Sequence, residues 1–214
     1  MTVDQGIQLA VAIGTIAVAV LAIWGDRVRH WLGLGPRLNL ALPDPSGELG
    51  AIPEGDGTTT PARYYHLRVS NSHRWTQATN VRVVVVGLAR PAADGSLVAQ
   101  PLIGPLQLMW RFSSYHAIFS IVGPDDICDL GYLKYGEHFR LTPYVSPNTF
   151  AGSIGANERM QVELKALADN AESPSLCVEV SWDGKWSEDT IQMGRHLVVK
   201  EVNCSRSRQI TRSP

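Results

Sequence analysis

The stretch "RMQVELKAL", residues 159–167, decides the fold class. Apolar residues at the even positions 160 to 166 alternate with polar residues at the odd positions between them. Successive side chains of a β-strand point to opposite faces, so this alternation predicts a strand with one face in a core and one in solvent. A second run, "LCVEVSW" at residues 176–182, alternates in the same way and ends at the tight-turn dipeptide Asp183-Gly184.

Further strand-like runs precede and follow these two, with turn residues between them and no long helical period. They are "RLNLAL" (37–42), "YYHLRVSN" (64–71), "NVRVVVVGL" (80–88), "LQLMW" (106–110), "DLGYLKY" (129–135), "FRLTPYV" (139–145) and "RHLVVK" (195–200). About nine short strands predict an antiparallel β-sandwich over residues 37–202 in place of a βαβ sheet. Residues 43–60 are expected to form a flexible loop.

The N-terminal segment carries no charged side chain from Gln5 to Gly25. As a helix it would extend roughly 31 Å, which matches the ~30 Å hydrocarbon core of a membrane. A cleaved export signal normally has a basic start and a small-residue cleavage site. Here no Lys or Arg precedes the run, and bulky Ile23 and Trp24 end it. Residues 1–32 are therefore predicted to be a retained transmembrane anchor with a juxtamembrane turn.

The flanking charges predict the orientation of this anchor. Arg27 and Arg29 follow the apolar run, whereas no basic residue precedes it, and Lys and Arg accumulate on the cytoplasmic side. We therefore expect the N-terminus outside and the C-terminal domain in the cytoplasm, at the inner (plasma) membrane. Trp24 and Trp31 suit the aromatic belt at the membrane interface.

Two features at the chain ends leave alternatives open. Gly6, Ala10 and Gly14 recur at every fourth position, which either allows a homodimer of closely packed helices or reflects the abundance of Ala and Gly. The basic tail, residues 203–214, contains three arginines and no acid. Such a segment is expected to be disordered and either contacts anionic lipid or is simply solvated.

Composition sets limits on the compartment and on the class of ligand. Cys128, Cys177 and Cys204 form an odd set without a C-x-x-C pair, so free thiols in a reducing compartment are predicted. The net charge of −1 gives no reason to expect nucleic acid as a partner.

The run "YYHLRVSNSHRWTQATNVRVVV" resembles the B and C strands of immunoglobulin-like bacterial modules, in which V-x-N turns into A-x-N-V-x-V. The matching positions are Val69, Asn71, Ala78, Asn80, Val81 and Val83. The order of "WGDRVR", this strand pair, "ICDLGYL" and "VSWDGKW" resembles uncharacterised bacterial single-pass membrane proteins with a C-terminal immunoglobulin-like β-sandwich domain. The resemblance implies a fold and no activity. Asn71 suits the turn because its side chain can bond nearby backbone and it tolerates positive φ.

No catalytic motif is visible, and no catalytic residue, cofactor or metal is expected. The sequence lacks H-E-x-x-H, G-x-S-x-G and the phosphate-binding glycine loops. Asp125 and Asp126, with His116 and His138, keep open an enzyme with an unrecognised metal site. Carboxylates near Cys128 would disfavour its thiolate, which argues against a nucleophilic cysteine.

Aromatic residues in loops and turns are the best sequence candidates for recognition. Arg74 and Trp75 lie in a polar loop, and Trp186 follows the Asp183-Gly184 turn; these three form a possible interaction surface. The alternative is a hydrophobic lid over the end of the sandwich. The leading expectation is a non-enzymatic module that binds an unidentified protein partner at the membrane. The alternative is an exported carbohydrate- or envelope-binding sandwich.

Overall fold

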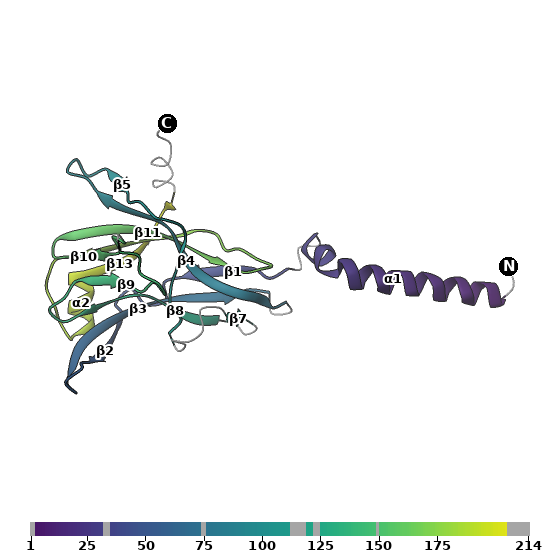
Figure 1. Cartoon of the computed structure of the whole chain (residues 1–214), viewed down its shortest axis with the longest axis horizontal. Coiled ribbons are helices and arrows are strands. Elements are labelled where there is room, and N and C mark those ends of the chain that lie inside the picture. Colours follow the sequence, from purple (N-terminus) through teal and green to yellow (C-terminus); the bar gives the residue numbers. More distant parts are fainter. Residues whose placement is uncertain are drawn as a thin grey trace.

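The computed structural model describes residues 3–31, 35–73, 76–111, 119–121, 125–148 and 150–204. Their fold is mainly β, preceded by one long helix (Figure 1). The elements are α1 (Val3–Trp31), β1 (Leu38–Ala41), β2 (Glu48–Pro53), β3 (Thr59–Asn71), β4 (Ala78–Pro91), β5 (Leu97–Ala99), β6 (Leu106–Gln107), β7 (Phe119–Ile121), β8 (Asp125–Lys134), β9 (Phe139–Leu141), β10 (Ser153–Ile154), β11 (Glu158–Leu167), β12 (Leu176–Trp182), α2 (Thr190–His196) and β13 (Leu197–Val202).

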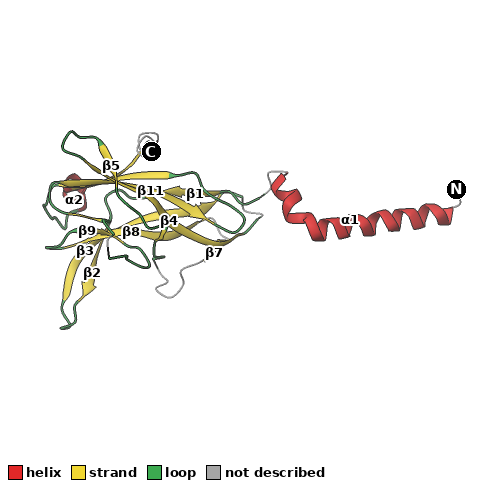
Figure 2. Ribbon diagram, turned by 45° about the horizontal axis from the view of Figure 1, so that its top comes forward, coloured by secondary structure: helices red, strands yellow, loops and turns green. Residues whose placement is uncertain are grey.

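The strands form two antiparallel sheets that face each other, as predicted (Figure 2). The first sheet has the order β1-β3-β8-β9-β10, with β2 paired to β3. The second has the order β13-β12-β11-β4-β5, with β6 and β7 paired to β4. One hydrophobic cluster takes side chains from both sheets, including Leu67, Val83, Leu130 and Val162. Burial of these apolar side chains between the two layers is the main stabilising contribution to the fold.

The alternation in β11 and β12 produces the inner face of the second sheet. Met160, Val162, Leu164 and Ala166 are all buried, which confirms the strand predicted from "RMQVELKAL". Strand β11 pairs with β12 on one side and with β4 on the other. Strand β4 pairs with β11 along one edge and with β5, β6 and β7 along the other, and its valine run is largely buried.

The connection from β3 to β4 carries the chain from the first sheet to the second, and Asn71 holds it. Asn71 is buried; its Oδ1 accepts hydrogen bonds from the backbone N–H groups of Arg37 and His73, at 3.0 and 3.1 Å. The expectation that this side chain bonds nearby backbone is confirmed. The positive φ lies elsewhere: Asn80, within β4, has φ 54°.

Part of the segment expected to be a flexible loop is a strand. Residues Glu48–Pro53 form β2, which pairs antiparallel with the first half of β3. Just before it, Gly47 has φ +71° and lies against Tyr65. Strand β2 is at the sheet edge with alternate side chains exposed or half-exposed, so no buried face marks it in the sequence.

The N-terminal segment forms the helix α1, which ends at Trp31. Residues 25 and 26 lie inside α1, so the juxtamembrane part of residues 1–32, predicted to be a turn, is helical up to Trp31. One helical glycine costs only about 1 kcal/mol, too little to end a helix by itself. The side chain of Trp24 is 54% exposed, while those of Arg27, Arg29 and Trp31 lie outside the described residues.

Among the residues that the structure describes, no helix combines the length and the apolar character needed to cross a membrane. The structure therefore confirms a helix at residues 3–31, and its insertion into a membrane stays a prediction. The large apolar side chains described along it are exposed: Ile7, Val11, Ile13, Ile16, Val18 and Val20.

The two ends of the sheets differ in their surroundings. We call the end next to α1 proximal; it contains the start of β1 and the end of β3, whose residues Leu38 and Asn71 are paired. The opposite, distal end contains the end of β4, the β8–β9 turn and α2 (Figures 1 and 2). In both views α1 leads away from the sheets at the proximal end.

Candidate functional site

A pocket of 670 Å³ opens at the distal end, on the outer face of the second sheet. Its volume lies within the range of small-molecule sites, roughly 300–1,000 Å³. Four segments line it: the β4–β5 hairpin, the start of β11, the end of β12 and the junction of α2 with β13. The lining residues are Arg90, Pro91, Ala92, Ala93, Gly95, Asn157, Glu158, Arg159, Ser181, Trp182, Asp183, Arg195, His196 and Val198.

The floor of this pocket is one row of residues across three strands. Arg159 of β11 is paired with Ser181 of β12, and Ser181 is paired with Val198 of β13. Residues directly opposite each other in antiparallel strands point to the same face. Arg159 is therefore beside Ser181 on the outer face, since its neighbour Met160 is buried in the core.

The short helix α2 brings a second arginine to the same pocket. Asp189 caps its start by accepting a 2.8 Å hydrogen bond from the N–H of Gln192. Arg195 lies in its last turn and is exposed. The buried side chain of Met193 fixes the helix on the core, which leaves Arg195 at the pocket.

A third arginine, Arg90, is held by the protein itself. It donates to the carbonyl oxygen of Ala151 at 3.0 Å and also to that of Ser153. Its other terminal nitrogen lies 3.3 Å from Glu158 Oε2. The same oxygen of Glu158 accepts a 2.9 Å hydrogen bond from the N–H of Gly155. Arg90 and Glu158 thus connect β4 to the turn before β11.

On the opposite wall, Asp183 and His196 form a pair. Nδ1 of His196 lies 2.8 Å from Asp183 Oδ2, and Asp183 Oδ1 accepts a 2.9 Å hydrogen bond from the N–H of Lys185. Desolvation acts to raise the pKa of Asp183, but the Lys185 N–H and the His196 ring together lower it below its ordinary value. Asp183 is therefore ionised at neutral pH.

Two arginines of the pocket have no partner among the residues that the structure describes. Within the described ranges, neither Arg159 nor Arg195 makes a hydrogen bond or ion pair, and the hydroxyl of Ser181 has no hydrogen-bond partner. The lining holds three arginines and two carboxylates, which is a formal charge of +1 with His196 neutral. The pocket can therefore offer guanidinium and hydroxyl donors to a ligand.

Trp182 gives the pocket a rigid wall. Its indole Nε1–H donates a 2.9 Å hydrogen bond to the carbonyl oxygen of Lys185, across the turn in which Gly184 has φ +89°. The ring also packs against the hydrophobic core. The alternation along β12 puts Trp182 on the same face as Val178 and Val180, which are buried.

The interaction surface expected from the sequence, Arg74, Trp75 and Trp186, stays a prediction. Trp186 is at the distal end, partly buried, with its ring in edge contact with Tyr135 at a centroid distance of 5.8 Å. Arg74 and Trp75 lie outside the described residues. Their neighbours His73 and Thr76 follow β3 at the proximal end. Packing of Trp186 against the core agrees with the alternative of a hydrophobic lid.

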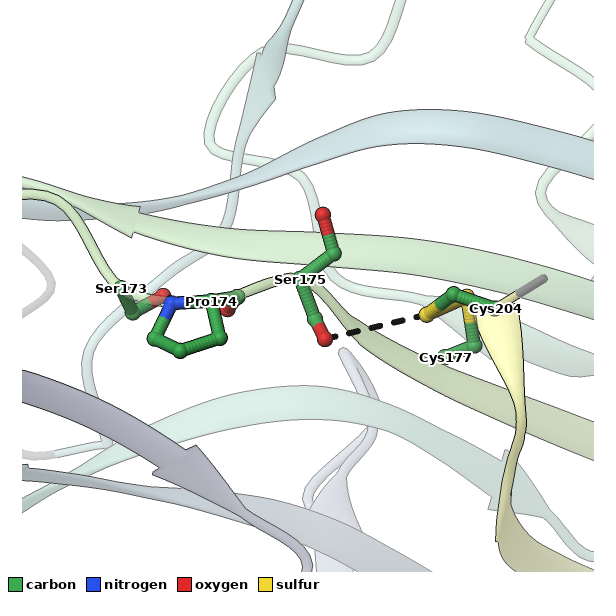
Figure 3. Close-up of a disulfide and its surroundings, with 5 residues drawn as sticks. All are labelled: Ser173, Pro174, Ser175, Cys177 and Cys204. Carbon is green, nitrogen blue, oxygen red and sulfur yellow. Dashed lines mark hydrogen bonds between the residues drawn. A yellow bond between two sulfur atoms is a disulfide. The ribbon is translucent and has the colours of Figure 1, made fainter. Parts of the chain in front are cut away.

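The expectation of free thiols is wrong for two of the three cysteines. Cys177 and Cys204 form a disulfide with a Cα–Cα distance of 5.3 Å (Figure 3), although free thiols were predicted. The β12–β13 pairing explains this, because Cys177 is opposite Val202 and Cys204 follows two residues later. In Figure 3 the sulfur of Cys204 approaches the carbonyl oxygen of Ser175, 3.7 Å away. A disulfide sulfur has no proton, so we treat this approach as a contact.

Cys128 is the cysteine outside the disulfide, and it is fully buried. Its Sγ–H donates to the carbonyl oxygen of Met109 at 3.1 Å. Burial, and next the nearby carboxylates of Asp129 and Asp126, raise the pKa of this thiol well above its ordinary value. The structure thus supports the expectation that Cys128 is not a nucleophile.

Among the residues considered for a metal site, those that the structure describes are not brought together. Asp125 and Asp126 begin β8 at the proximal end, whereas His138 lies in the turn beyond the other end of this ten-residue strand. That strand length separates them by roughly 30 Å. His116 lies outside the described residues. Over the described ranges, no three His, Cys, Asp or Glu side chains are grouped to hold a metal.

The arginines of the pocket were not identified as site residues from the sequence, although the strand alternation contains part of the information. The alternation of "RMQVELKAL" and "LCVEVSW" places Arg159 and Ser181 on outward faces. Only the strand register reveals that they are neighbours, and α2 was not predicted at all, because residues 195 and 196 were assigned to a strand.

Comparison with known proteins adds no assignment: no protein-family model matches the chain, and no curated protein matches it either.

Proposed function

We propose that this chain is a non-enzymatic binding module: an immunoglobulin-like β-sandwich, attached to a membrane by its N-terminal segment, that binds a ligand in the distal pocket. The observation that carries the proposal is the position of this pocket. It lies at the end of the sheets opposite α1 (Figure 1), so a membrane-attached domain would present it away from the lipid.

The strand connections support the immunoglobulin-like assignment. Consecutive strands β3 and β4 lie in different sheets, β8 returns to the first sheet beside β3, and β11 pairs with β4 in the second. Such crossing between two facing sheets is characteristic of Greek-key sandwiches. The additional strand β13 extends the second sheet beyond β12.

Attachment to a membrane is supported by the surface of α1. Its described apolar side chains are exposed, Ile7, Ile13 and Val18 by 58–68%. Large exposed apolar surfaces mark contact with lipid or with another protein. Gly6 and Gly14 have open space where a side chain would be, so homodimerisation of this helix through Gly6, Ala10 and Gly14 stays part of the proposal.

We infer the side of the membrane by weighing the disulfide against the flanking arginines. The cytoplasm keeps thiols reduced, so a structural disulfide there is rare. Arg27 and Arg29 favour a cytoplasmic domain, but long domains are translocated across a membrane largely regardless of such flanking charges. The Cys177–Cys204 bond therefore favours the second expectation, an exported domain that faces an oxidising compartment.

Reporter fusions to the C-terminus of the full chain test the side. We expect activity from a reporter that works only after export, such as alkaline phosphatase, and no fluorescence from a green fluorescent protein fusion. The opposite result would place the domain in the cytoplasm, and the pocket would then have to serve a cytoplasmic ligand.

A site-specific crosslink tests the pocket itself. A photoreactive benzophenone amino acid replaces Ala93, which lines the pocket and is exposed, in the full chain in its own membranes. Ala99, exposed on the same hairpin but outside the pocket, provides the matched control. We expect a light-dependent adduct at position 93 and none at position 99. No adduct at either position, or the same adduct at both, would contradict binding at the pocket.

A further inference from the structure

We infer that the distal pocket binds a sugar-sized ligand through a phosphate or carboxylate group, held by the guanidinium groups of Arg159 and Arg195. This inference rests on the proposed function, because it names the chemistry of the ligand for the same pocket. It goes further by assigning the two residues that recognise the ligand.

The first step is that the N–H donors of the two arginines are available to a ligand. Arg159 and Arg195 line one pocket and have no partner in the described part of the chain. A guanidinium offers five N–H donors in a planar fork that matches the oxygens of a carboxylate or phosphate. Two such forks in one pocket, without internal acceptors, are available to the oxygens of an anion.

The second step is that the acids of the pocket are already satisfied. The Oε2 atom of Glu158 accepts from Gly155 N–H and is paired with Arg90. Both oxygens of Asp183 accept hydrogen bonds, from Lys185 and His196. Neither carboxylate pairs with Arg159 or Arg195, so an incoming anion does not have to displace an internal partner.

The third step is the floor between the two arginines. Ser181 separates Arg159 from Val198 in the strand register, and neighbouring strands are about 4.8 Å apart. The Ser181 hydroxyl, half-buried, adds a donor beside Arg159. Val198 adds an apolar contact next to α2, from whose last turn Arg195 projects. An oxyanion over Ser181 would thus have charged donors on two sides.

The fourth step concerns the source of the oxyanion. The pocket is at the distal end, whereas α1 leaves from the proximal end (Figure 2). Headgroups of the membrane that holds α1 would therefore meet the opposite end of the domain. Together with a volume of 670 Å³, this favours a sugar acid or sugar phosphate over an anionic lipid.

Calorimetry with the full chain in detergent tests the inference with defined probes. The probes are glucuronate, glucose 6-phosphate, inorganic phosphate, neutral glucose, and vesicles containing anionic lipid. We expect glucuronate or glucose 6-phosphate to bind, and glucose to show no binding. Each of Arg159→Gln and Arg195→Gln should weaken this affinity at least ~10-fold, because each removes charge-assisted hydrogen bonds.

Arg82→Gln is the matched control, since Arg82 is exposed on β4 in the same sheet but does not line the pocket. It should leave the affinity within about twofold. Equal weakening by all three variants would show unspecific charge attraction and overturn the inference. Binding of the vesicles alone would overturn it in favour of lipid.

The crosslink at position 93 distinguishes a failure of the inferred ligand chemistry from a failure of the proposed function. If no anionic probe binds while the adduct at position 93 persists, the oxyanion chemistry is wrong and the binding pocket stands. If the adduct is also absent, the proposed function fails as well. Circular dichroism of each variant verifies the fold, and the exposure of both arginines predicts unchanged spectra.

Discussion

Nη2 of Arg63 donates a 2.8 Å hydrogen bond to the backbone carbonyl oxygen of Glu188. Arg63 belongs to β3 and is completely buried, while Glu188 lies just before α2. The other terminal nitrogen donates to the Gly47 carbonyl at 3.1 Å, and to Ser46 O and Thr190 Oγ1 at 3.3 Å. One guanidinium therefore connects the β1–β2 loop, β3 and the start of α2, the helix that positions Arg195.

Replacing Arg63 by leucine should destabilise the protein by about 3 kcal/mol, because several buried acceptors would lose their donor at once. Arg63→Lys should be intermediate, since one ammonium cannot reach all of these acceptors. Urea unfolding followed by tryptophan fluorescence measures both. Arg68→Leu, on the same strand with an exposed side chain, should change stability by less than about 1 kcal/mol. Equal losses at the two positions would contradict the structural role of Arg63.

A pair of glycine substitutions separates steric overlap from backbone strain. A Cβ on Gly47 would lie 2.8 Å from the ring of Tyr65 and 2.9 Å from the Tyr64 carbonyl oxygen, at φ +71°. At Gly57, φ is +85° and nothing lies within 4 Å of the added atom. Gly57→Ala should therefore cost about 1–2 kcal/mol of conformational strain. Gly47→Ala should cost clearly more, as measured by the shift of the thermal midpoint. A smaller effect at Gly47 would show that the loop adapts freely.

Lys134 lies between two carboxylates at the distal end and controls their titration. Its Nζ is 2.8 Å from both Glu54 Oε1 and Glu137 Oε1. The Lys134 hydrogen bond is the largest influence on Glu137 and lowers its pKa below the ordinary value of 4.5. A lowered carboxyl pKa means that the pair contributes stability above about pH 4.5 and loses it as the pH falls through the folded-state pKa.

In Lys134→Gln, the pKa of Glu137 should rise towards 4.5, and the acid-side pH dependence of stability should weaken. Carbon-13 NMR titration of the glutamate carboxyl groups measures the first effect. Arg140→Gln is the control: Arg140 also pairs with Glu137, at 2.9 Å, but it contributes less to the shift and should raise the pKa less. A larger rise in Arg140→Gln would reverse this ranking.

The fold class could be predicted because the strands that pack on the core alternate regularly. Strand β11 shows this most clearly, since its even-numbered residues 160–166 are all buried. Elements without a buried face could not be predicted in this way. Strand β2 exposes most of its residues, and the seven-residue α2 is too short for a helical period to be visible.

The candidate site depended on information that the sequence does not carry. Arg159 and Ser181 are 22 positions apart, and only the register of β11 against β12 makes them neighbours. The odd number of cysteines suggested free thiols, but the pairing of β12 with β13 brings Cys177 close to Cys204. In both cases a shift of the strand register by one residue would place the side chain on the other face of the sheet.

The last prediction concerns the disulfide. It links the stability of the protein to the compartment that the domain faces. Cys177 and Cys204 are separated by 27 positions, and closing a loop of this length restricts the unfolded chain by about 3–4 kcal/mol. Dithiothreitol should therefore lower the unfolding free energy of the native protein by about this amount. It should have no effect on Cys204→Ser, which should match the reduced native protein. The third cysteine, Cys128, is buried, and its thiol is the same in both. Alkylation of intact cells before lysis completes the test: protection of both Cys177 and Cys204 from the reagent, reversed by prior reduction, is expected if the domain faces an oxidising compartment. Labelling of both cysteines without reduction would place the domain on the reducing side, as Arg27 and Arg29 alone would favour.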